Sequence, residues 1–204
     1  VTVKARCERR YIKGLLLNLA IGKSLQQKPG NVSVQQVLTA VENVLDYAHK
    51  KGWYHLDVHP SNIIVVDNGD ETCRYILIDW GKAVKKVNET TKLTSFHGTP
   101  PFLHPEMLLV KKKKDNTWSG PVPSAALDKF SLAMTLAYIE HKGVPWSGFH
   151  KKVVTDDMLK DRYDKAVQLI NNSFLDQPSK DKVLDWISEP SQQPPPPSQP
   201  QTPR

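Results

Sequence analysis

Apolar residues recur at helical spacing between Ser33 and Gly52, with polar residues on the opposite face. The apolar face is formed by Val34, Val37, Leu38, Val41, Val44, Leu45 and Ala48. Ser33 suits an N-cap, and Gln36 follows three residues later, as in a capping box. Gly52, directly after two lysines, suits a helix C-terminus. The pattern therefore predicts one amphipathic helix between Ser33 and Gly52.

Three later segments also have helical patterns. Residues 124–140 are apolar on nearly every side, which predicts a buried helix. Residues 156–170 and 180–187 are apolar on one face, which predicts two further amphipathic helices.

Shorter apolar runs predict strands. Residues 1–7 alternate apolar and polar side chains, and a second extended run follows at 11–19 after a charged turn. Residues 63–66 and 75–78 flank the turn sequence 67–70, which predicts a β-hairpin. The chain is therefore expected to be α+β, and mainly α.

The composition is typical of a globular protein, with 39% apolar and 24% charged residues. The net charge of +7 favours acidic partners without choosing among them. No apolar run approaches the length that spans a membrane. Cys7 and Cys73 are too few for a disulfide framework and match no zinc pattern. An intracellular setting, cytoplasmic or nuclear, is therefore expected.

The last residues have a different composition. From Glu189 onward the chain is rich in proline and almost without apolar side chains to bury, which predicts a disordered tail. Pro197, Pro200 and Pro203 have the PxxP spacing of ligands for SH3-type or WW-type domains. A tail without any ligand is the simpler interpretation.

Two short segments carry candidate chemistry for phosphoryl transfer. His55-Leu56-Asp57 is followed after four residues by Asn62. The carboxylate of Asp57 can accept a hydroxyl proton, and the amide of Asn62 can hold a metal.

Asp79-Trp80-Gly81 stands at the end of the second hairpin strand. A carboxylate is a preferred ligand of Mg²⁺, so Asp79 is the second candidate metal ligand. Gly81 gives the backbone freedom to turn after it.

Two further motifs follow in the chain. Residues 98–106 read GTPPFLHPE, and residues 128–133 read DKFSLA. With the two segments above, their order and spacing resemble the C-terminal lobe of a eukaryotic protein kinase, over about residues 11 to 150. In that family these motifs are the catalytic loop, the metal-binding loop, the end of the activation segment and the start of a buried central helix.

The resemblance implies ATP and Mg²⁺ as cofactors and a protein as the second substrate. It assigns catalytic roles to Asp57, His59 and Thr99, metal binding to Asn62 and Asp79, and nucleotide binding to Asn18, Ala20 and Ile64. The Gly-Thr pair at Thr99 favours serine and threonine as acceptors. The resemblance also gives His55 a structural role and makes Asp128 the residue that holds the catalytic-loop backbone.

Two residues depart from the family pattern within the catalytic loop. Leu56 replaces an arginine that pairs with a phosphorylated activation segment, so activity is expected to depend little on phosphorylation of Thr91, Thr94 or Ser95. His59 replaces a lysine, and an imidazole is mostly neutral at physiological pH. Slower transfer, or a preference for mildly acidic conditions, is therefore expected.

Glu106 raises a separate question, because in the resembled family it pairs with a buried arginine. Arg162 is expected to lie too early in the sequence for this contact, which leaves Lys180 or Lys182 as substitutes.

The N-terminal lobe of the resembled family is almost absent, with no Gly-rich loop and no convincing counterpart of its nucleotide-binding lysine, since Lys4 is a poor candidate. We therefore expect an N-lobe remnant and hinge at 1–29, a kinase C-lobe at 30–187 and a disordered tail at 188–204. The function expected is phosphoryl transfer from ATP to protein serine or threonine, by a fragment of a longer kinase. A catalytically impaired or kinase-mimicking binding module remains the alternative. No membrane and no nucleic acid partner is predicted.

Overall fold

The computed structural model describes residues 2–7, 10–15, 20–27, 32–68, 73–88, 91–93, 95, 97–109, 111–112, 118–142 and 156–188. Asn18, Thr94 and the proline-rich tail lie outside the described residues. The described helices are α1 (Val34–Lys50), α2 (Ala125–His141), α3 (Asp156–Asn171) and α4 (Gln177–Ser188). All four predicted helices are therefore confirmed, with ends within a few residues of the sequence pattern.

α1 begins and ends at the residues that its sequence indicates. The Ser33 Oγ accepts a hydrogen bond from the Gln36 N–H at 3.3 Å, as an N-cap does. Gly52 has a φ of +75°, a conformation that is strained for residues with a side chain. Val37, Leu38, Val41, Leu45 and Ala48 form the buried face.

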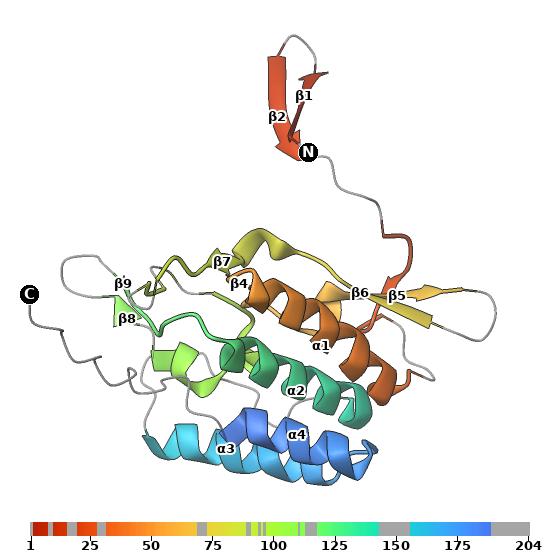
Figure 1. Cartoon of the computed structure of the whole chain (residues 1–204), viewed down its shortest axis with the longest axis vertical. Helices are drawn as coiled ribbons and strands as arrows, with labels where there is room; N and C mark the ends of the chain where they lie inside the picture. The colour runs from red at the N-terminus through yellow and green to blue at the C-terminus, as the bar shows by residue number, and fades with distance from the viewer. Residues whose placement is uncertain are drawn as a thin grey trace, which may run out of the picture.

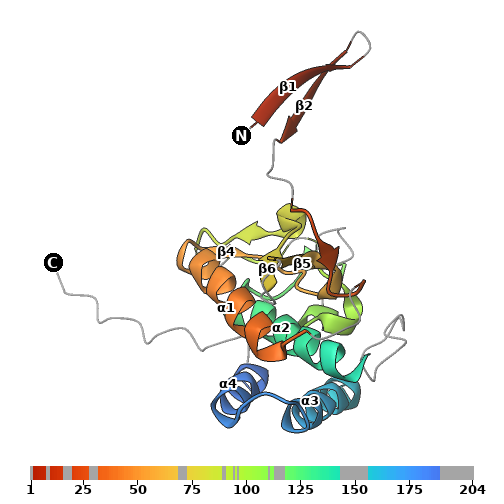
Figure 2. The same ribbon diagram turned by 90° about the vertical axis from the view of Figure 1, so that its right-hand side faces the viewer.

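α2 is the central helix of the body. It packs against α1 on one side and against α3 and α4 on the other, as Figures 1 and 2 show. Phe130, Leu132, Met134 and Leu136 are almost fully buried in the main core. Because α2 is covered from several directions, its apolar residues have no helical periodicity, which explains the all-round apolar sequence.

Within the described residues, the strands form four small antiparallel sheets. They are β1 (Thr2–Cys7) with β2 (Arg10–Leu15); β3 (Lys23–Ser24) with β5 (Ile63–Asp67) and β6 (Cys73–Leu77); β4 (Trp53–Tyr54) with β7 (Val84–Lys85); and β8 (Lys111–Lys112) with β9 (Trp118–Ser119). The predicted hairpin is confirmed as β5–β6. β3, β4, β7, β8 and β9 were not predicted, because two residues are too few to show alternation.

Four short 3-10 helices lie within or beside the sequence motifs. They are η1 (Pro60–Asn62), η2 (Trp80–Lys82), η3 (Pro100–Phe102) and η4 (Pro105–Leu109). None of the helices in the described part of the chain combines the length and the apolar composition that a bilayer crossing requires.

A second, smaller apolar cluster lies beside these turns. It consists of Leu56, Leu93, Leu103, Met107 and Leu127, all less than 4% exposed. This cluster joins the loop after β4 to the segment that contains η3 and η4. Leu56, where the resembled family has an arginine, is therefore part of a core.

Candidate active site

Asp128, in the first turn of α2, fixes the backbone of the loop at 55–57. The carboxylate is fully buried. It accepts hydrogen bonds from the N–H of His55 at 2.8 Å and from the N–H of Leu56 at 2.7 Å. The His49 Nε2 lies 2.8 Å from the same carboxylate. Leu56 has a φ of 62°, a strained conformation for a leucine that these bonds help to maintain.

Asp57 is the centre of the site. Its side chain is 4% exposed. The Thr99 Oγ1 donates to Oδ1 at 2.7 Å, and the Lys82 Nζ donates to Oδ2 at 2.8 Å. Burial by itself raises the pKa of Asp57, but the hydrogen bonds from Lys82 and Thr99, together with nearby positive charge, outweigh it and hold the pKa below its ordinary value. Asp57 is therefore ionised at neutral pH, as a proton acceptor must be.

His59 lies beside Asp57 without bonding to it. The His59 Nε2 is 3.7 Å from the Asp57 Oδ1, beyond the range of a hydrogen bond. The imidazole stacks on the Phe102 ring, with 5.8 Å between the ring centroids. Burial lowers the pKa of His59, and the nearby Asp57 carboxylate offsets only part of this effect. His59 is therefore neutral at physiological pH and supplies no fixed positive charge.

Asn62 and Asp79 lie at adjacent strand ends. Asn62 precedes β5 and Asp79 follows β6, and the Ile78 N–H donates to the Asn62 carbonyl at 2.8 Å. The Asn62 Nδ2 donates to the Asp57 carbonyl at 3.0 Å, which leaves the amide oxygen as the atom that can meet a cation. The β5–β6 pairing therefore brings both predicted metal ligands to one place.

The backbone at Asp79 turns sharply and exposes its side chain. Asp79 has a φ of 60° and a ψ of 65°, and its Oδ1 accepts a 3.3 Å hydrogen bond from the Gly81 N–H. The side chain thus acts as the N-cap of η2. An exposed carboxylate held at a fixed turn suits a ligand for a hard cation.

His55 joins the Asp57 loop to the Asp79 loop. It is fully buried, and its Nε2 lies 3.0 Å from the carbonyl of Ile78. Its Nδ1 accepts from the Asp57 N–H at 3.2 Å, which assigns the ring proton to Nε2. The ring also meets the edge of Trp80, with 4.7 Å between centroids. These contacts support a structural role for His55.

Of the predicted nucleotide-binding residues, Ile64 lies in β5, and Ala20 precedes the segment that pairs with β5 through β3. Ser24 pairs with Ile64 across these strands. The segment after Ala20 runs so close to β5 that a Cβ on Gly22 would lie 2.3 Å from the Val65 carbonyl oxygen. Glycine is therefore required at position 22 for this approach. Asn18, the third predicted residue, lies outside the described residues.

Arg162 reaches the segment that precedes Glu106. It is fully buried, and its Nη2 donates to the carbonyls of Pro100 at 2.8 Å and Leu103 at 2.6 Å. The expectation that Arg162 lies too early in the sequence to pair with Glu106 stays a prediction. The helix that carries Arg162, α3, packs against η4, which contains Glu106.

The two lysines proposed as substitutes have other partners. Lys180 donates to the Asn171 carbonyl, and Lys182 pairs with Glu42 at 2.6 Å.

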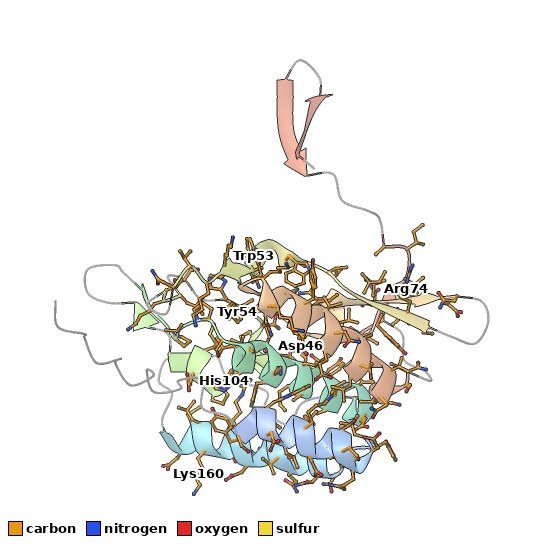
Figure 3. All side chains as sticks on the ribbon, in the orientation of Figure 1. Asp46, Trp53, Tyr54, Arg74, His104 and Lys160 are labelled. Carbon is orange, nitrogen blue, oxygen red and sulfur yellow. The ribbon has the colours of Figure 1, made fainter. Side chains whose placement is uncertain are left out.

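His104 is buried between α2 and α3, the helix that carries Arg162 (Figure 3). Its Nδ1 accepts from the Glu106 N–H at 3.2 Å, and its Nε2 lies 3.3 Å from the Tyr163 hydroxyl. The ring meets the edges of the Phe130 and Tyr163 rings. Burial, with a smaller effect of the Arg162 cation, lowers the pKa of His104 to about 3. Its role is in packing and not in the chemistry at Asp57.

Sequence reasoning did not identify Lys82 as a site residue. Lys82 follows Asp79-Trp80-Gly81 directly, but this adjacency does not show which group its side chain reaches. One turn of 3-10 helix carries its side chain back to Asp57, and this reversal is not visible in the spacing of the sequence motifs.

The family model of the protein kinase domain matches residues 11–193, and the chain therefore belongs to the protein kinase family. It is 36% identical over 115 residues to calcium-dependent protein kinase 5 of Plasmodium berghei, covering 53% of this chain and 20% of the relative. It is 29% identical over 155 residues to mouse sperm motility kinase 3A, covering 73% and 28%. It is 26% identical over 166 residues to the rat interferon-induced, double-stranded RNA-activated protein kinase, covering 76% and 28%. The aligned part thus spans less than a third of each of these relatives.

Proposed function

We propose that this chain carries the catalytic half of a protein kinase that transfers the γ-phosphoryl group of ATP to protein hydroxyl groups. The observation that carries the proposal is the Asp57 carboxylate, held by Thr99 at 2.7 Å and Lys82 at 2.8 Å beside the two candidate metal ligands. Phosphoryl transfer requires a positioned hydroxyl, charge neutralisation and little else from the protein. Asp57 can position a hydroxyl, and Asn62 and Asp79 can hold a cation that neutralises charge, which supports the proposal.

Asp57 is the residue proposed to act on the acceptor. Its carboxylate orients the substrate hydroxyl and takes the hydroxyl proton as the new oxygen–phosphorus bond forms. The bond between the γ-phosphorus and the bridging oxygen breaks, and ADP leaves. Thr99 and Lys82 fix the orientation of the carboxylate, because each occupies one of its oxygens.

The donor set at Asn62 and Asp79 fits Mg²⁺. One carboxylate, one amide oxygen and the phosphate oxygens of the nucleotide match the preference of this ion for a few protein oxygens. Asn62 and Asp79 would hold the ion, which when bound neutralises negative charge on the phosphates. The close approach of Gly22 to β5 supports a nucleotide-base site near Ala20 and Ile64. The family resemblance adds Asn18, which lies outside the described residues.

The bond from Thr99 to Asp57 supports serine and threonine as the acceptors, in line with the family resemblance. The same resemblance supports residues 30–187 as a C-lobe, 1–29 as the remnant of an N-lobe with its hinge, and 188–204 as a disordered tail. We propose an intracellular setting and a protein substrate. The proline-rich tail is a candidate ligand for an SH3-type or WW-type domain.

The second candidate is a kinase-like binding module without catalysis. The observation that favours it is the neutral, buried imidazole of His59, where the resembled family has a lysine.

Two measurements test the proposal on the full chain. Calorimetry should detect binding of Mg²⁺-ATP that is lost in Asp79→Ala and retained in Asp157→Ala, a change at an exposed aspartate of α3. Transfer of labelled phosphate to a serine or threonine peptide should be lost in Asp57→Asn. Binding that survives Asp79→Ala would contradict the metal assignment. Binding without transfer would favour the binding module.

A further inference from the structure

We propose that Lys82 takes the place of a catalytic-loop lysine in this chain, holding the Asp57 carboxylate and supplying the fixed positive charge to the transferred phosphoryl group. This inference rests on the proposed function and assigns a positive charge to the site. It gives the residue after Asp79-Trp80-Gly81 a role that its position in the sequence does not suggest.

The first support is the direct contact. The Lys82 Nζ lies 2.8 Å from the Asp57 Oδ2, while the Thr99 Oγ1 takes Oδ1. A hydrogen bond between two ionised groups is shorter and stronger than one between neutral groups. The two donors together fix the plane of the carboxylate, which sets the direction in which Asp57 can receive a proton.

The second support is the way the backbone of Lys82 is held. η2 begins after Asp79, whose Oδ1 accepts from the Gly81 N–H, and ends at Lys82. The His97 Nδ1 lies 2.9 Å from the Lys82 carbonyl oxygen, and the Ser95 Oγ lies 2.8 Å from the other ring nitrogen. The single turn of η2 therefore connects Asp79, a candidate metal ligand, to Lys82. We infer that the two side chains approach the same phosphate.

The third support is the position of His59. Its imidazole is stacked on Phe102, and its Nε2 lies 3.7 Å from the Asp57 Oδ1. The side chain of His59 is 14% exposed, whereas that of Lys82 is 47% exposed. Of these two side chains, Lys82 is therefore the more accessible to an incoming phosphate. Electrostatic stabilisation of the transferred group needs such a charge in place before the reaction.

The ion pair is tested first in the ligand-free chain. Amine acetylation followed by peptide mass spectrometry should show that Lys82 reacts more slowly in the wild type than in Asp57→Asn. A difference of about two- to five-fold fits a half-exposed ion pair. Lys160, an exposed lysine of α3, serves as the internal reference and should react equally in both chains (Figure 3). Equal reactivity of Lys82 in the two chains would overturn the inference, whatever the activity of the chain.

The role in transfer is tested by exchange of the cation between two positions. Lys82→Met should lower kcat by about 100-fold with little change in KM, the loss typical of a group that stabilises the transition state. The double variant Lys82→Met/His59→Lys should regain at least about tenfold of that loss, because it returns a cation to the other side of Asp57. Lys160→Met is the matched control and should retain wild-type kinetics.

The possible results separate the inference from the proposed function. A purely structural role for Lys82 predicts no recovery in the double variant, and that result would overturn the inference. Higher activity of Lys82→Met would also overturn it, because Lys82 would then block Asp57. A wild-type chain that neither binds Mg²⁺-ATP nor transfers phosphate would overturn the proposed function, while the labelling result would still show whether the ion pair exists.

Discussion

Acidification from pH 8 to pH 5 is predicted to weaken the fold through His104. Burial, aided by the nearby Arg162 cation, lowers the pKa of this imidazole from 6.5 to about 3. The contacts give the same direction, because the His104 Nδ1 accepts from the Glu106 N–H and would lose that bond on protonation. The folded chain therefore keeps His104 neutral where the unfolded chain protonates it.

This difference in protonation between the folded and unfolded chain sets the sign and size of the change in stability with pH. Between pH 6.5 and pH 3 the unfolded state binds one proton more than the folded state at His104, so stability falls as the pH falls. Each pH unit below the unfolded pKa costs about 1.4 kcal/mol. At pH 5 the cost relative to pH 8 is about 2 kcal/mol, and the full cost near pH 3 is about 5 kcal/mol.

Urea unfolding of the wild type and His104→Ala at the two pH values isolates this contribution, because other titrating groups cancel in the comparison. Tryptophan fluorescence reports the transition, since Trp186 is buried in α4. At pH 8 the variant should be less stable, because it leaves a cavity beside Phe130. At pH 5 the difference in the free energy of unfolding between the wild type and His104→Ala should be smaller by about 2 kcal/mol. His141→Ala, which removes an exposed imidazole, should follow the wild type. A difference in the free energy of unfolding that is the same at both pH values would refute the reasoning.

Three further predictions concern the loop around Asp57. Asp128→Ala should lower the free energy of unfolding by about 3 kcal/mol or more in urea unfolding, because it leaves the buried N–H groups of His55 and Leu56 without their acceptor. Thr99→Val should lower kcat by about tenfold in the transfer assay, and Thr99→Ser should largely restore it, since the serine hydroxyl can bond Asp57 again. Leu56→Arg should destabilise the fold by about 3 kcal/mol or more on thermal unfolding, whereas Leu56→Met should cost less than about 1.5 kcal/mol.

Each of these predictions has a result that contradicts it. Wild-type stability of Asp128→Ala would mean that the loop amides find other partners. Equal kcat values for the valine and serine variants at Thr99 would show that its hydroxyl bond is irrelevant. A well-folded Leu56→Arg chain would mean that the side chain escapes from the apolar cluster to solvent.

The local elements could be predicted from the sequence because their signals are local. The cap at Ser33 and the break at Gly52 fix the ends of α1 within a few residues, and both are visible in the printed chain. The β5–β6 hairpin could also be predicted, because two apolar runs flank a turn sequence. The pairing of β4 with β7 could not be predicted, because each strand has two residues and the partners are about thirty residues apart.

The candidate site was predicted only where motif spacing carries the information. Asp57, Asn62 and Asp79 stand in motifs, and the β5–β6 register brings the last two together. The contact of Lys82 with Asp57 depends on the turn at η2, which short-range patterns do not specify. The contacts of Arg162 with the carbonyls of Pro100 and Leu103 were not predicted for a similar reason, because they depend on how α3 packs and not on distance along the chain.

Asp128 also sets an order of events during synthesis of the chain. The amides of His55 and Leu56 find their acceptor 73 and 72 residues further on. Closing so long a loop is slow compared with forming a helix such as α1. A nascent chain that ends before α2 therefore contains the complete Asp57–Asn62 sequence but lacks the group that gives it its shape. Any shortened product that stops before residue 128 should retain the motif and lack the geometry of the site.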